Sequence, residues 1–382
     1  MIYLDSNATT PILPEVLEAM LPFLRDEYGN PSSGHALGRR AAGAIAESRE
    51  AVASVIGAEP TEIVFLSGGT ESDNLAIKGS ARKKPANGEW QIITSAVEHP
   101  AVLKTARSMT ENGYRESVIP VNQNGVVNLD ALRDALDSKT VLVSIMHSNN
   151  ETGTVEPVKE IAKIVKKMDE SILVHTDAIQ SAGKVPLDVN DLGVDLLSIS
   201  AHKMYGPKGI GALYVRRGLK LDSLMTGGSH ERGRRAGTEN VTGIVGFGKA
   251  CEIAERDIES DSARITKLRD QFEERLLSAI PYAAINCSGA DRLPGTSNVC
   301  FGAVKGETIF IQCDLQGIAL STGSACSSGS VEPSHVLTAT GLDAGRAEGS
   351  IRFSFGKTNR VEDIDYLLER LPAIVEAAKT TL

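Results

Sequence analysis

The sequence lacks the features that would assign the protein to a membrane, to secretion or to nucleic-acid binding. No uninterrupted apolar stretch reaches the roughly 18 residues of a membrane-spanning helix, and no basic segment followed by an apolar one opens the chain, so neither a transmembrane helix nor a signal peptide is expected. The chain has no long run of Lys and Arg, and its net charge is −9. These properties argue against membrane and direct nucleic-acid partners and favour a cytosolic enzyme.

Cysteine is scarce, and its spacing offers no metal or disulfide pattern. The five cysteines are an odd number without a C-x-x-C pair, so we expect no disulfide framework and no zinc site. Four have apolar neighbours and are expected to be small core residues: Cys251, Cys287, Cys300 and Cys313. Cys326 lies instead in the small, polar run L-S-T-G-S-A-C-S-S-G-S. That run suits an accessible, nucleophilic thiol on a mobile loop; the alternative is a tolerated exposed cysteine.

The chain does have length and a regular alternation of strands and helices. Its 382 residues are enough for a large core, and we expect two domains. Apolar segments of strand length alternate with helical patterns, and the strands central to the prediction cover residues 62–66, 91–95, 140–146, 172–176 and 195–200. Such spacing is typical of βα units and predicts an α/β fold with a parallel sheet.

Lys203 follows one of these apolar strands, in the stretch D-L-L-S-I-S-A-H-K-M-Y-G-P-K-G-I-G of residues 195–211. Desolvation at such a position favours a neutral amine, which can form a Schiff base with an aldehyde cofactor. Ser200 and His202 stand close enough in sequence to donate to a phosphate, and the glycines that follow allow close approach of the backbone. The alternative is a surface lysine in a glycine-rich turn.

Polar residues also follow the other predicted strands. Asp177 suits a protonated ring nitrogen, as pyridoxal phosphate requires, whereas Thr70, in the turn S-G-G-T, suits a phosphate. His99 suits stacking on a cofactor ring, and Asn150 follows the carboxyl end of another strand. Each of these residues has a simpler alternative role as a helix cap or turn residue. Because the carboxyl ends of parallel strands share one edge of a sheet, we expect them to meet Lys203 there.

The rest of the chain predicts a second, smaller domain. A long helical region at about residues 241–280 leads to two further strands and two further helices, near residues 297–301, 351–355, 307–316 and 361–379. Before it, residues 227–240 read G-G-S-H-E-R-G-R-R-A-G-T-E-N. This segment is either a solvated loop or a donor of groups, including Thr238, to a phosphate across a dimer interface.

Taken together, these motifs resemble those of the NifS/IscS-type cysteine desulfurases, which are pyridoxal-phosphate enzymes of the class V aminotransferase family. The segments S-G-G-T-E-S-D-N, H-S-N-N-E-T-G, H-T-D-A-I-Q, S-A-H-K and G-S-A-C-S-S-G occur in the family's order, and the resemblance covers essentially the whole chain. It implies the aspartate-aminotransferase-like fold (PLP fold type I), with a mostly parallel large-domain sheet and a smaller α/β C-terminal domain. The implied divisions are an N-terminal segment joining the small domain (1–14), a large cofactor domain (15–255) and a small domain (256–382) that carries the catalytic cysteine loop.

The resemblance also implies a role for each matching residue. Lys203 would bind the cofactor covalently, Asp177 would pair with its ring nitrogen, His99 would stack on the ring and Gln180 would contact the phenolic oxygen. The implied phosphate ligands are Gly69, Thr70, Ser200, His202 and, from the partner subunit of a homodimer with a shared active site, Thr238. Asn150 and Arg352 would hold the substrate carboxylate, and Arg352 also suits bidentate recognition.

The implied reaction removes sulfur from L-cysteine. Lys203 would take the Cα proton, and the Cys326 thiolate would attack the substrate sulfur, leaving L-alanine and an enzyme persulfide. The Ser/Gly-rich loop around Cys326 resembles that of the group I enzymes, which implies transfer to an acceptor or scaffold protein for iron-sulfur cluster assembly, tRNA thiolation or DNA phosphorothioation. No metal ligand is implied beyond a role of Cys326 in sulfur or cluster transfer.

Two departures and three alternatives accompany this interpretation. Ser6 stands where many members have Asn, and Gly69 stands where many have Ala. The departure at Gly69 affects the geometry of the phosphate loop. The enzymatic alternatives are a selenocysteine lyase or an aminotransferase on the same scaffold, of which the aminotransferase would not need Cys326. The alternative of another class is a non-catalytic sulfur-pathway scaffold, which the presence of Lys203, Asp177 and Cys326 argues against.

Overall fold

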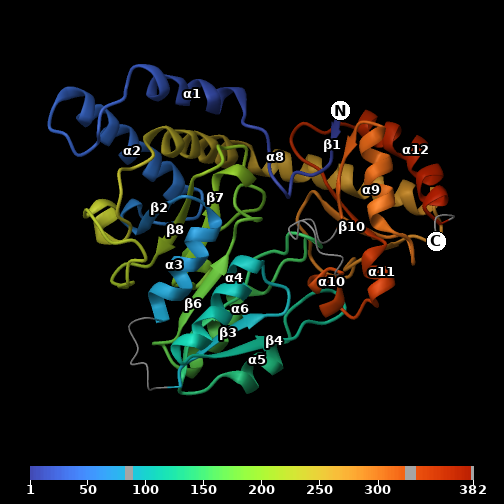
Figure 1. Ribbon diagram of the computed structural model, residues 1–382, viewed down its shortest axis with the longest axis horizontal. Coiled ribbons are helices and arrows are strands. Elements are labelled where there is room, and N and C mark those ends of the chain that lie inside the picture. Colours follow the sequence, from blue (N-terminus) through green and yellow to red (C-terminus); the bar gives the residue numbers. More distant parts are fainter. Residues whose placement is uncertain (82–88, 323–332, 380–382) are drawn as a thin grey trace.

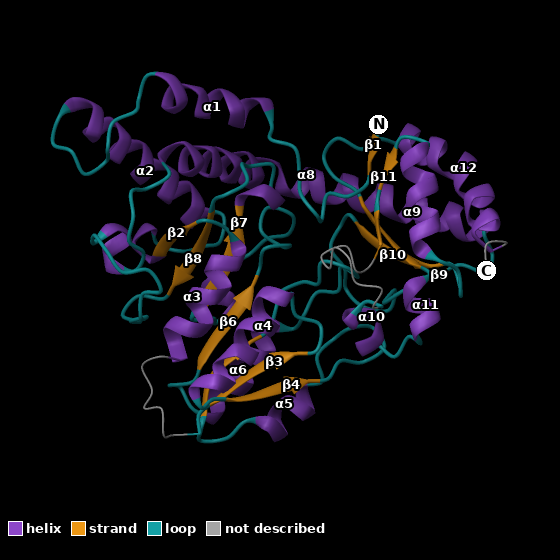
Figure 2. Ribbon diagram, in the orientation of Figure 1, coloured by secondary structure: helices purple, strands orange, loops and turns teal. Residues whose placement is uncertain are grey.

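The computed structural model describes residues 1–81, 89–322 and 333–379. In these ranges its largest sheet has seven strands, in the order β2-β8-β7-β6-β5-β3-β4. Their bounds are β2 Ile63–Leu66, β8 Gly211–Val215, β7 Leu196–Ser200, β6 Leu173–Asp177, β5 Thr140–Ser144, β3 Gln91–Ser95 and β4 Arg115–Ile119. Helices cover both faces of this sheet (Figures 1 and 2). The bounds of these and neighbouring helices are α1 Pro14–Arg25, α2 Ala36–Ser54, α3 Gly69–Ala81, α4 Pro100–Ser108, α5 Leu129–Ala135, α6 Val158–Met168 and α7 Val189–Leu192.

The strands are apolar on both sides because both faces of the sheet are buried. In β2, Ile63 and Phe65 belong to the core shared with α2 and α6, whereas Val64 and Leu66 belong to the core on the face of α3 and α4. This alternation follows from the two-residue period of a strand. The predicted α/β architecture is confirmed.

One strand breaks the predicted parallel pattern. β8 runs antiparallel to both β7 and β2, and all other pairs of neighbours in the sheet are parallel. Only ten residues, 201–210, connect β7 to β8. A parallel crossover needs about a dozen residues or more, usually including a helix, so the chain turns back instead. Lys203 lies in this short connection.

The C-terminal part is built around a smaller antiparallel sheet in the order β12-β13-β10-β9. Its strands are β9 Ala284–Ile285, β10 Thr296–Cys300, β12 Ser321–Thr322 and β13 Ser350–Ser354, and the helices of this part are α9 Gly306–Leu315, α10 His335–Ala339, α11 Ala344–Glu348 and α12 Val361–Lys379. The predicted core role of Cys251, Cys287, Cys300 and Cys313 is confirmed, since all four are buried.

The two parts are joined by α8 (Val241–Ala279), which runs from one to the other (Figure 1). Phe247 and Ala254 pack into the large core, while Leu268 and Phe272 pack into the small one. The predicted boundary between residues 255 and 256 falls between these two sets, and it stays a prediction. None of the described helices is long and apolar enough to cross a membrane.

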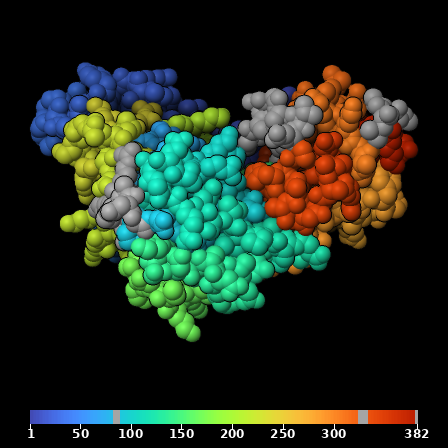
Figure 3. Space-filling model, turned by 60° about the horizontal axis from the view of Figure 1, so that its bottom comes forward, coloured from blue at the N-terminus to red at the C-terminus, as the bar shows by residue number. Residues whose placement is uncertain are grey.

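The N-terminal segment also connects the two parts. β1 (Ile2–Tyr3) pairs in parallel with β11 (Ile318–Ala319), and Leu4 is buried in the small core. The chain then passes over the end of β7, where the Thr10 N–H donates to the His202 carbonyl at 2.9 Å. In the space-filling view, orange and red residues of the small part lie against cyan residues of the large part (Figure 3).

Candidate active site

A cavity of about 310 Å³ lies at the carboxyl ends of the parallel strands. It brings together all the described residues predicted for the site except Thr238. Its lining consists of Asn7, Ala8, Gly69, Thr70, Asp73, His99, Met146, Ser148, Asn150, Asp177, Ile179, Gln180, Ser200, His202, Lys203 and Arg352. The convergence that the strand order predicted is therefore present.

Lys203 points into this cavity. The five residues of β7 are all buried, and the 3₁₀ turn Ala201–Lys203 follows directly. The Lys203 Nζ donates to the backbone carbonyl of Asn7 at 2.5 Å and to that of Ala8 at 2.7 Å. The amine is thus held by the N-terminal segment, and the alternative of a lysine in an open surface turn is wrong.

Asp177 ends β6 and is buried beside Lys203. Its Oδ1 accepts a hydrogen bond from the Ile179 N–H at 2.9 Å. Burial raises the pKa of Asp177 to about 6, against the opposing effects of the Ile179 N–H and of Lys203. A positive charge brought next to this carboxyl would favour its ionised form.

A second buried carboxyl, Asp73, lines the same cavity and was not predicted. It lies on α3, and neither carboxyl oxygen has a hydrogen-bond partner among the described residues. Burial, followed by the charge of Asp177, raises the pKa of Asp73 well above its usual range. The only sequence hint was its position three residues after Thr70, on the first turn and a half of the helix that follows the predicted phosphate turn.

His99 has the helix-capping role considered for it, and it also lies where the predicted stacking role would place it. It is the N-cap of α4, where its Nδ1 accepts from the Ala101 N–H at 3.1 Å, and its ring also lines the cavity. Burial, assisted by Lys203 and His335, lowers the pKa of His99 to about 4. The imidazole is therefore neutral near pH 7.

The part of the cavity next to α3 has the properties of an anion site. Gly69 and Thr70 begin this helix, whose first N–H groups have no helical partner. The Ser200 hydroxyl is buried and has no hydrogen-bond partner among the described residues. The His202 Nδ1 lies 3.2 Å from the Thr9 Oγ1, and burial, with Lys203 as the next cause, lowers the pKa of His202 to about 4.

The departure at Gly69 is matched by a neighbouring side chain. A Cβ atom at this position would lie 2.1 Å from the Ile179 Cδ1. The δ-methyl of Ile179 therefore fills the space that an alanine methyl would take. Gly69 and Ile179 are therefore complementary in size at this predicted phosphate turn.

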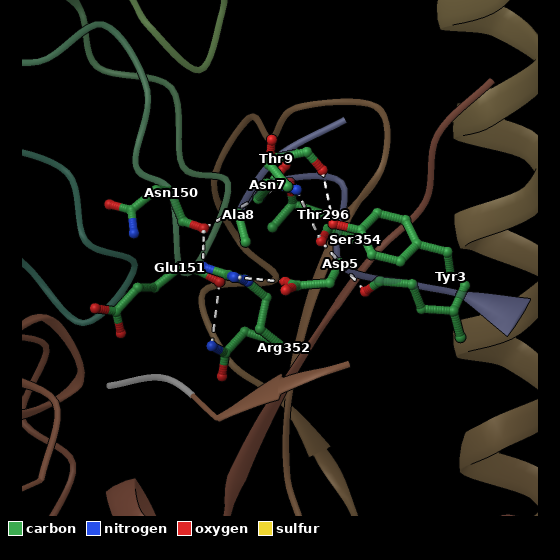
Figure 4. Close-up of polar contacts among 12 residues, drawn as sticks. Tyr3, Asp5, Asn7, Ala8, Thr9, Asn150, Glu151, Thr296, Arg352 and Ser354 are labelled. Atoms are coloured by element: carbon green, nitrogen blue, oxygen red, sulfur yellow. Dashed lines mark hydrogen bonds and ion pairs between the residues drawn. The ribbon is translucent and has the colours of Figure 1, made fainter. Parts of the chain in front are cut away.

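Arg352 reaches the cavity from β13 of the small sheet, and only 2% of its surface is exposed. Its Nη2 donates to the Asp5 carboxylate at 2.8 Å and its Nη1 to the Asn150 carbonyl at 3.1 Å (Figure 4). Its Nε has no acceptor among the described residues. Asn150 thus holds Arg352 through its backbone, while both residues line the cavity.

Asn7 is the centre of a hydrogen-bond network that sequence reasoning missed. Its Nδ2 donates to the Thr296 Oγ1 at 2.8 Å and to the Asn150 carbonyl at 3.1 Å (Figure 4). The Gln180 Nε2 donates to the Asn7 carbonyl at 2.9 Å, and the Lys184 Nζ donates to the Asn7 Oδ1 at 3.2 Å. The segment D-S-N-A-T-T-P predicted a turn, and nothing in it indicated these distant partners.

Two predicted residues lie elsewhere. Thr238 is exposed and lines a separate cavity of about 250 Å³, together with Arg235, which pairs with Glu71 at 3.2 Å. It does not reach the Lys203 cavity of its own chain. Cys326 lies outside the described residues.

Comparison with known proteins places this site in a family. Residues 2–367 match the family described as Aminotransferase class-V. The chain is 50% identical to a protein named cysteine desulfurase IscS from Dictyoglomus turgidum, over 99% of this chain and 95% of that one. It is 48% identical to the cysteine desulfurase IscS of Methanosarcina thermophila, over 98% and 92% of the two chains.

Solved structures agree with these relatives. A structure described as a NifS-like protein has a TM-score of 0.92 and 40% identity, and the match covers 98% of this chain and 99% of that one. Another, SspA in complex with cysteine, has a TM-score of 0.83 and 37% identity, over 93% and 99% of the two chains. The cavity built around Lys203 thus lies in a fold shared along almost the whole chain, and this chain belongs to the class-V aminotransferase family and, within it, to the cysteine desulfurases of the IscS/NifS type.

Proposed function

We propose that the protein removes sulfur from L-cysteine with pyridoxal 5′-phosphate as cofactor, and that the residues around Lys203 carry out this reaction. The observation that supports the assignment most directly is the position of Lys203 in a cavity that also contains a buried Asp177 and a buried Ser200 hydroxyl without a hydrogen-bond partner in the described ranges. SspA, one of the structural relatives, is described in complex with cysteine.

The residues present fit this cofactor. Ser200, Gly69, Thr70 and His202 would hold its phosphate, since the Ser200 hydroxyl needs a hydrogen-bond partner and the start of α3 favours an anion. Asp177 would face the ring nitrogen. When bound, pyridoxal phosphate joins amino groups covalently and withdraws electrons from the adjacent carbon of the substrate.

The chain's own groups then position the substrate and move protons. The Arg352 Nε, buried and without an acceptor among the described residues, would receive the substrate carboxylate together with the Asn150 side chain. The Lys203 Nζ would take the proton from the substrate Cα. His99, neutral because burial lowers its pKa, would stack on the ring and exchange a proton near the thiol. Gln180 would donate to the phenolic oxygen of the cofactor.

Cys326 would receive the sulfur. Its thiolate would form a bond to the substrate sulfur as the bond between that sulfur and Cβ breaks, and Cβ would gain a proton. The Lys203 Nζ would return its proton to Cα, which completes L-alanine. The persulfide would pass to an acceptor or scaffold protein.

We also propose the domain boundaries 1–14, 15–255 and 256–382. We further propose a homodimer in which Thr238 of one subunit contacts the phosphate site of the other, and a cytoplasmic location.

The test is to purify the protein, record its absorbance with pyridoxal phosphate, and measure alanine and sulfide from L-cysteine. The unaltered protein is expected to be yellow and to form both products. Lys203→Ala should lose the yellow band, and Cys326→Ala should keep it but form no persulfide. A keto acid product, with full turnover by Cys326→Ala, would indicate an aminotransferase. Activity on selenocysteine alone would indicate a selenocysteine lyase. A protein that stays colourless would indicate a non-catalytic scaffold.

A further inference from the structure

Lys184 is a lysine at the edge of the site that the proposed reaction does not use. It is half-buried and lies four residues after Gln180, beyond Gly183, whose φ of +70° turns the chain. Its Nζ donates to the Gln180 Oε1 at 3.0 Å and to the Asn7 Oδ1 at 3.2 Å. A half-buried lysine whose amine contacts two neutral amide oxygens is uncommon, because lysine amines removed from water are usually paired with carboxylates.

The charges around Lys184 do not include a carboxylate partner in the described part of the chain. Burial, followed by Lys203 and Arg352, lowers the pKa of Lys184 to about 7. Asp261 lines the small cavity on the other side of Lys184, but it pairs with Lys357 at 2.8 Å. The Lys184 amine therefore depends on the two amide oxygens for its hydrogen bonds.

This contact determines how the Gln180 side chain is oriented. Only the oxygen of a carboxamide can accept a hydrogen bond from an ammonium or amine N–H, so the Gln180 Oε1 must face Lys184. The Gln180 Nε2 then faces the other way, where one of its N–H groups donates to the Asn7 carbonyl at 2.9 Å. Gln180 also lines the Lys203 cavity, and its Nε2 makes no second hydrogen bond within the described residues.

We propose that Lys184 is a positioning residue, which holds the Gln180 carboxamide so that an amide N–H, and not the carbonyl oxygen, is presented to the phenolic oxygen of the cofactor. This inference rests on the proposed function, because it requires pyridoxal phosphate in the Lys203 cavity. Lys184 acts through Gln180 and does not itself touch the cofactor.

The experiment measures the absorbance of the cofactor-loaded protein as a function of pH. A hydrogen bond donated to the phenolic oxygen stabilises its anionic form, so losing it raises the pH at which the chromophore gains or loses its proton. Lys184→Met is expected to raise this midpoint by about one pH unit, the size of one ordinary hydrogen bond. Lys163→Met removes an exposed lysine of α6, which lies outside the Lys203 cavity, and should leave the midpoint unchanged.

A double-mutant cycle separates positioning through Gln180 from a general effect of charge. Gln180→Ala is expected to raise the midpoint by a similar amount, and adding Lys184→Met to it should change nothing further. Additive shifts would overturn the inference. So would a Lys184→Met protein with the midpoint of the unaltered protein.

Two further variants cover the possibility that Lys184→Met is too unstable to purify. Lys184→Gln has a shorter side chain that cannot reach both oxygens, and it should shift the midpoint in the same direction; no shift would overturn the inference. Lys184→Arg keeps the charge and the donors and should stay near the original midpoint, whereas a shift as large as that of Lys184→Gln would contradict it. If the unaltered protein never turns yellow, the proposed function fails, and that outcome is distinct from all of these.

Discussion

The Lys203 cavity has two walls of different construction. We call the first the sheet wall; it consists of Thr70, His99, Asp177, Ser200 and Lys203, which follow the ends of strands in the large sheet. The second, the domain wall, consists of Asn7, Ala8 and Arg352, which come from the N-terminal segment and the small sheet. One wall is held in place by a single sheet, whereas the other depends on contacts between segments far apart in the sequence.

The difference indicates a division of labour. The groups suited to the cofactor lie on the sheet wall, where strand pairing keeps them in register. Arg352, the cation suited to a carboxylate, lies on the domain wall, where Asp5 and the Asn150 carbonyl hold it. Changes in the sheet wall should therefore affect cofactor binding, and changes in the domain wall should affect substrate binding while the cofactor stays in place.

The largest effect is expected from the sheet wall at Lys203. Lys203→Ala removes the amine that would bind the cofactor and move the Cα proton, and it should lower kcat by at least about 10³-fold. The yellow band should disappear as well. Lys163→Ala, at an exposed lysine of α6 outside the cavity, serves as the control and should change neither property. A Lys203→Ala protein that still forms alanine at the original rate would remove Lys203 from the reaction.

The next largest effect should come from the domain wall at Arg352. Arg352→Met removes a buried charge that would receive the substrate carboxylate, and KM for L-cysteine should rise on the order of 100-fold. The absorbance of the bound cofactor should not change. A change in the absorbance without a change in KM would break the proposed division between the walls.

A matched control for this variant is Arg292→Met. Arg292 is also well buried and also pairs with a carboxylate, Glu273, at 2.7 Å, but it lies outside the cavity. Both variants lose an ion pair, so both are expected to lose stability. Only Arg352→Met should raise KM, which separates substrate recognition from a loss of packing.

A third prediction concerns the stability of the cofactor-free protein. Because burial raises the pKa of Asp177 from its usual 3.8 to about 6, its protonated form is favoured on folding, and this contribution is complete below its ordinary pKa. The contribution is lost as the pH rises through about 6. Asp177→Asn is neutral at every pH and should therefore be more stable than the unaltered protein at pH 7, by about 3 kcal/mol.

Urea unfolding of the two cofactor-free proteins at several pH values tests this. Their free energies of unfolding should converge below about pH 4, where Asp177 is protonated in both the folded and the unfolded state. Asp191→Asn replaces an exposed aspartate. Its free energy of unfolding should not exceed that of the unaltered protein at pH 7, so no difference of this kind should disappear at low pH. A difference between Asp177→Asn and the unaltered protein that is the same at pH 4 and pH 7 would contradict the assignment.

The smallest effect should arise at Gly69. Its φ is not in the left-handed region, so an alanine is limited mainly by the Ile179 side chain, whose flexible Cδ1 would lie 2.1 Å from the new Cβ and whose Cγ1 would lie 3.1 Å from it. Gly69→Ala should weaken cofactor binding by no more than about tenfold, the cost of moving one rotamer. Ile179→Val removes the crowding methyl, so the double variant should recover the lost affinity. Failure to recover it would show that the turn itself, and not Ile179, requires glycine.

Much of the fold and of the sheet wall could be predicted because their determinants are local. Strand β6 and its terminal Asp177, and strand β7 with Lys203 shortly after it, are visible as short apolar runs that end in a polar residue. Parallel strands place such ends together, so their meeting followed from topology alone. The direction of β8 was missed, although the ten-residue connection after β7 was the sign of it.

The domain wall could not be predicted in the same way. The Lys203 amine meets the Asn7 carbonyl across 196 positions of the sequence, and Arg352 meets Asp5 across 347. Asp73 and Lys184 sit in segments with ordinary local roles, a helix and a turn. No periodicity connects residues so far apart, since their proximity follows from how the two parts of the molecule pack.

By itself, then, the sequence determined the alternation of strands and helices, the residues that follow the strands, and the family. The first two depend on neighbours along the chain, and the family depends on short motifs that occur in its typical order. Only the tertiary structure decided which partners hold those residues: Asn7 on Lys203, Asp5 on Arg352, Lys184 on Gln180 and Ile179 against Gly69. The physical reason is that hydrogen bonds and ion pairs act over a few ångströms of space, whatever the length of chain between the two groups.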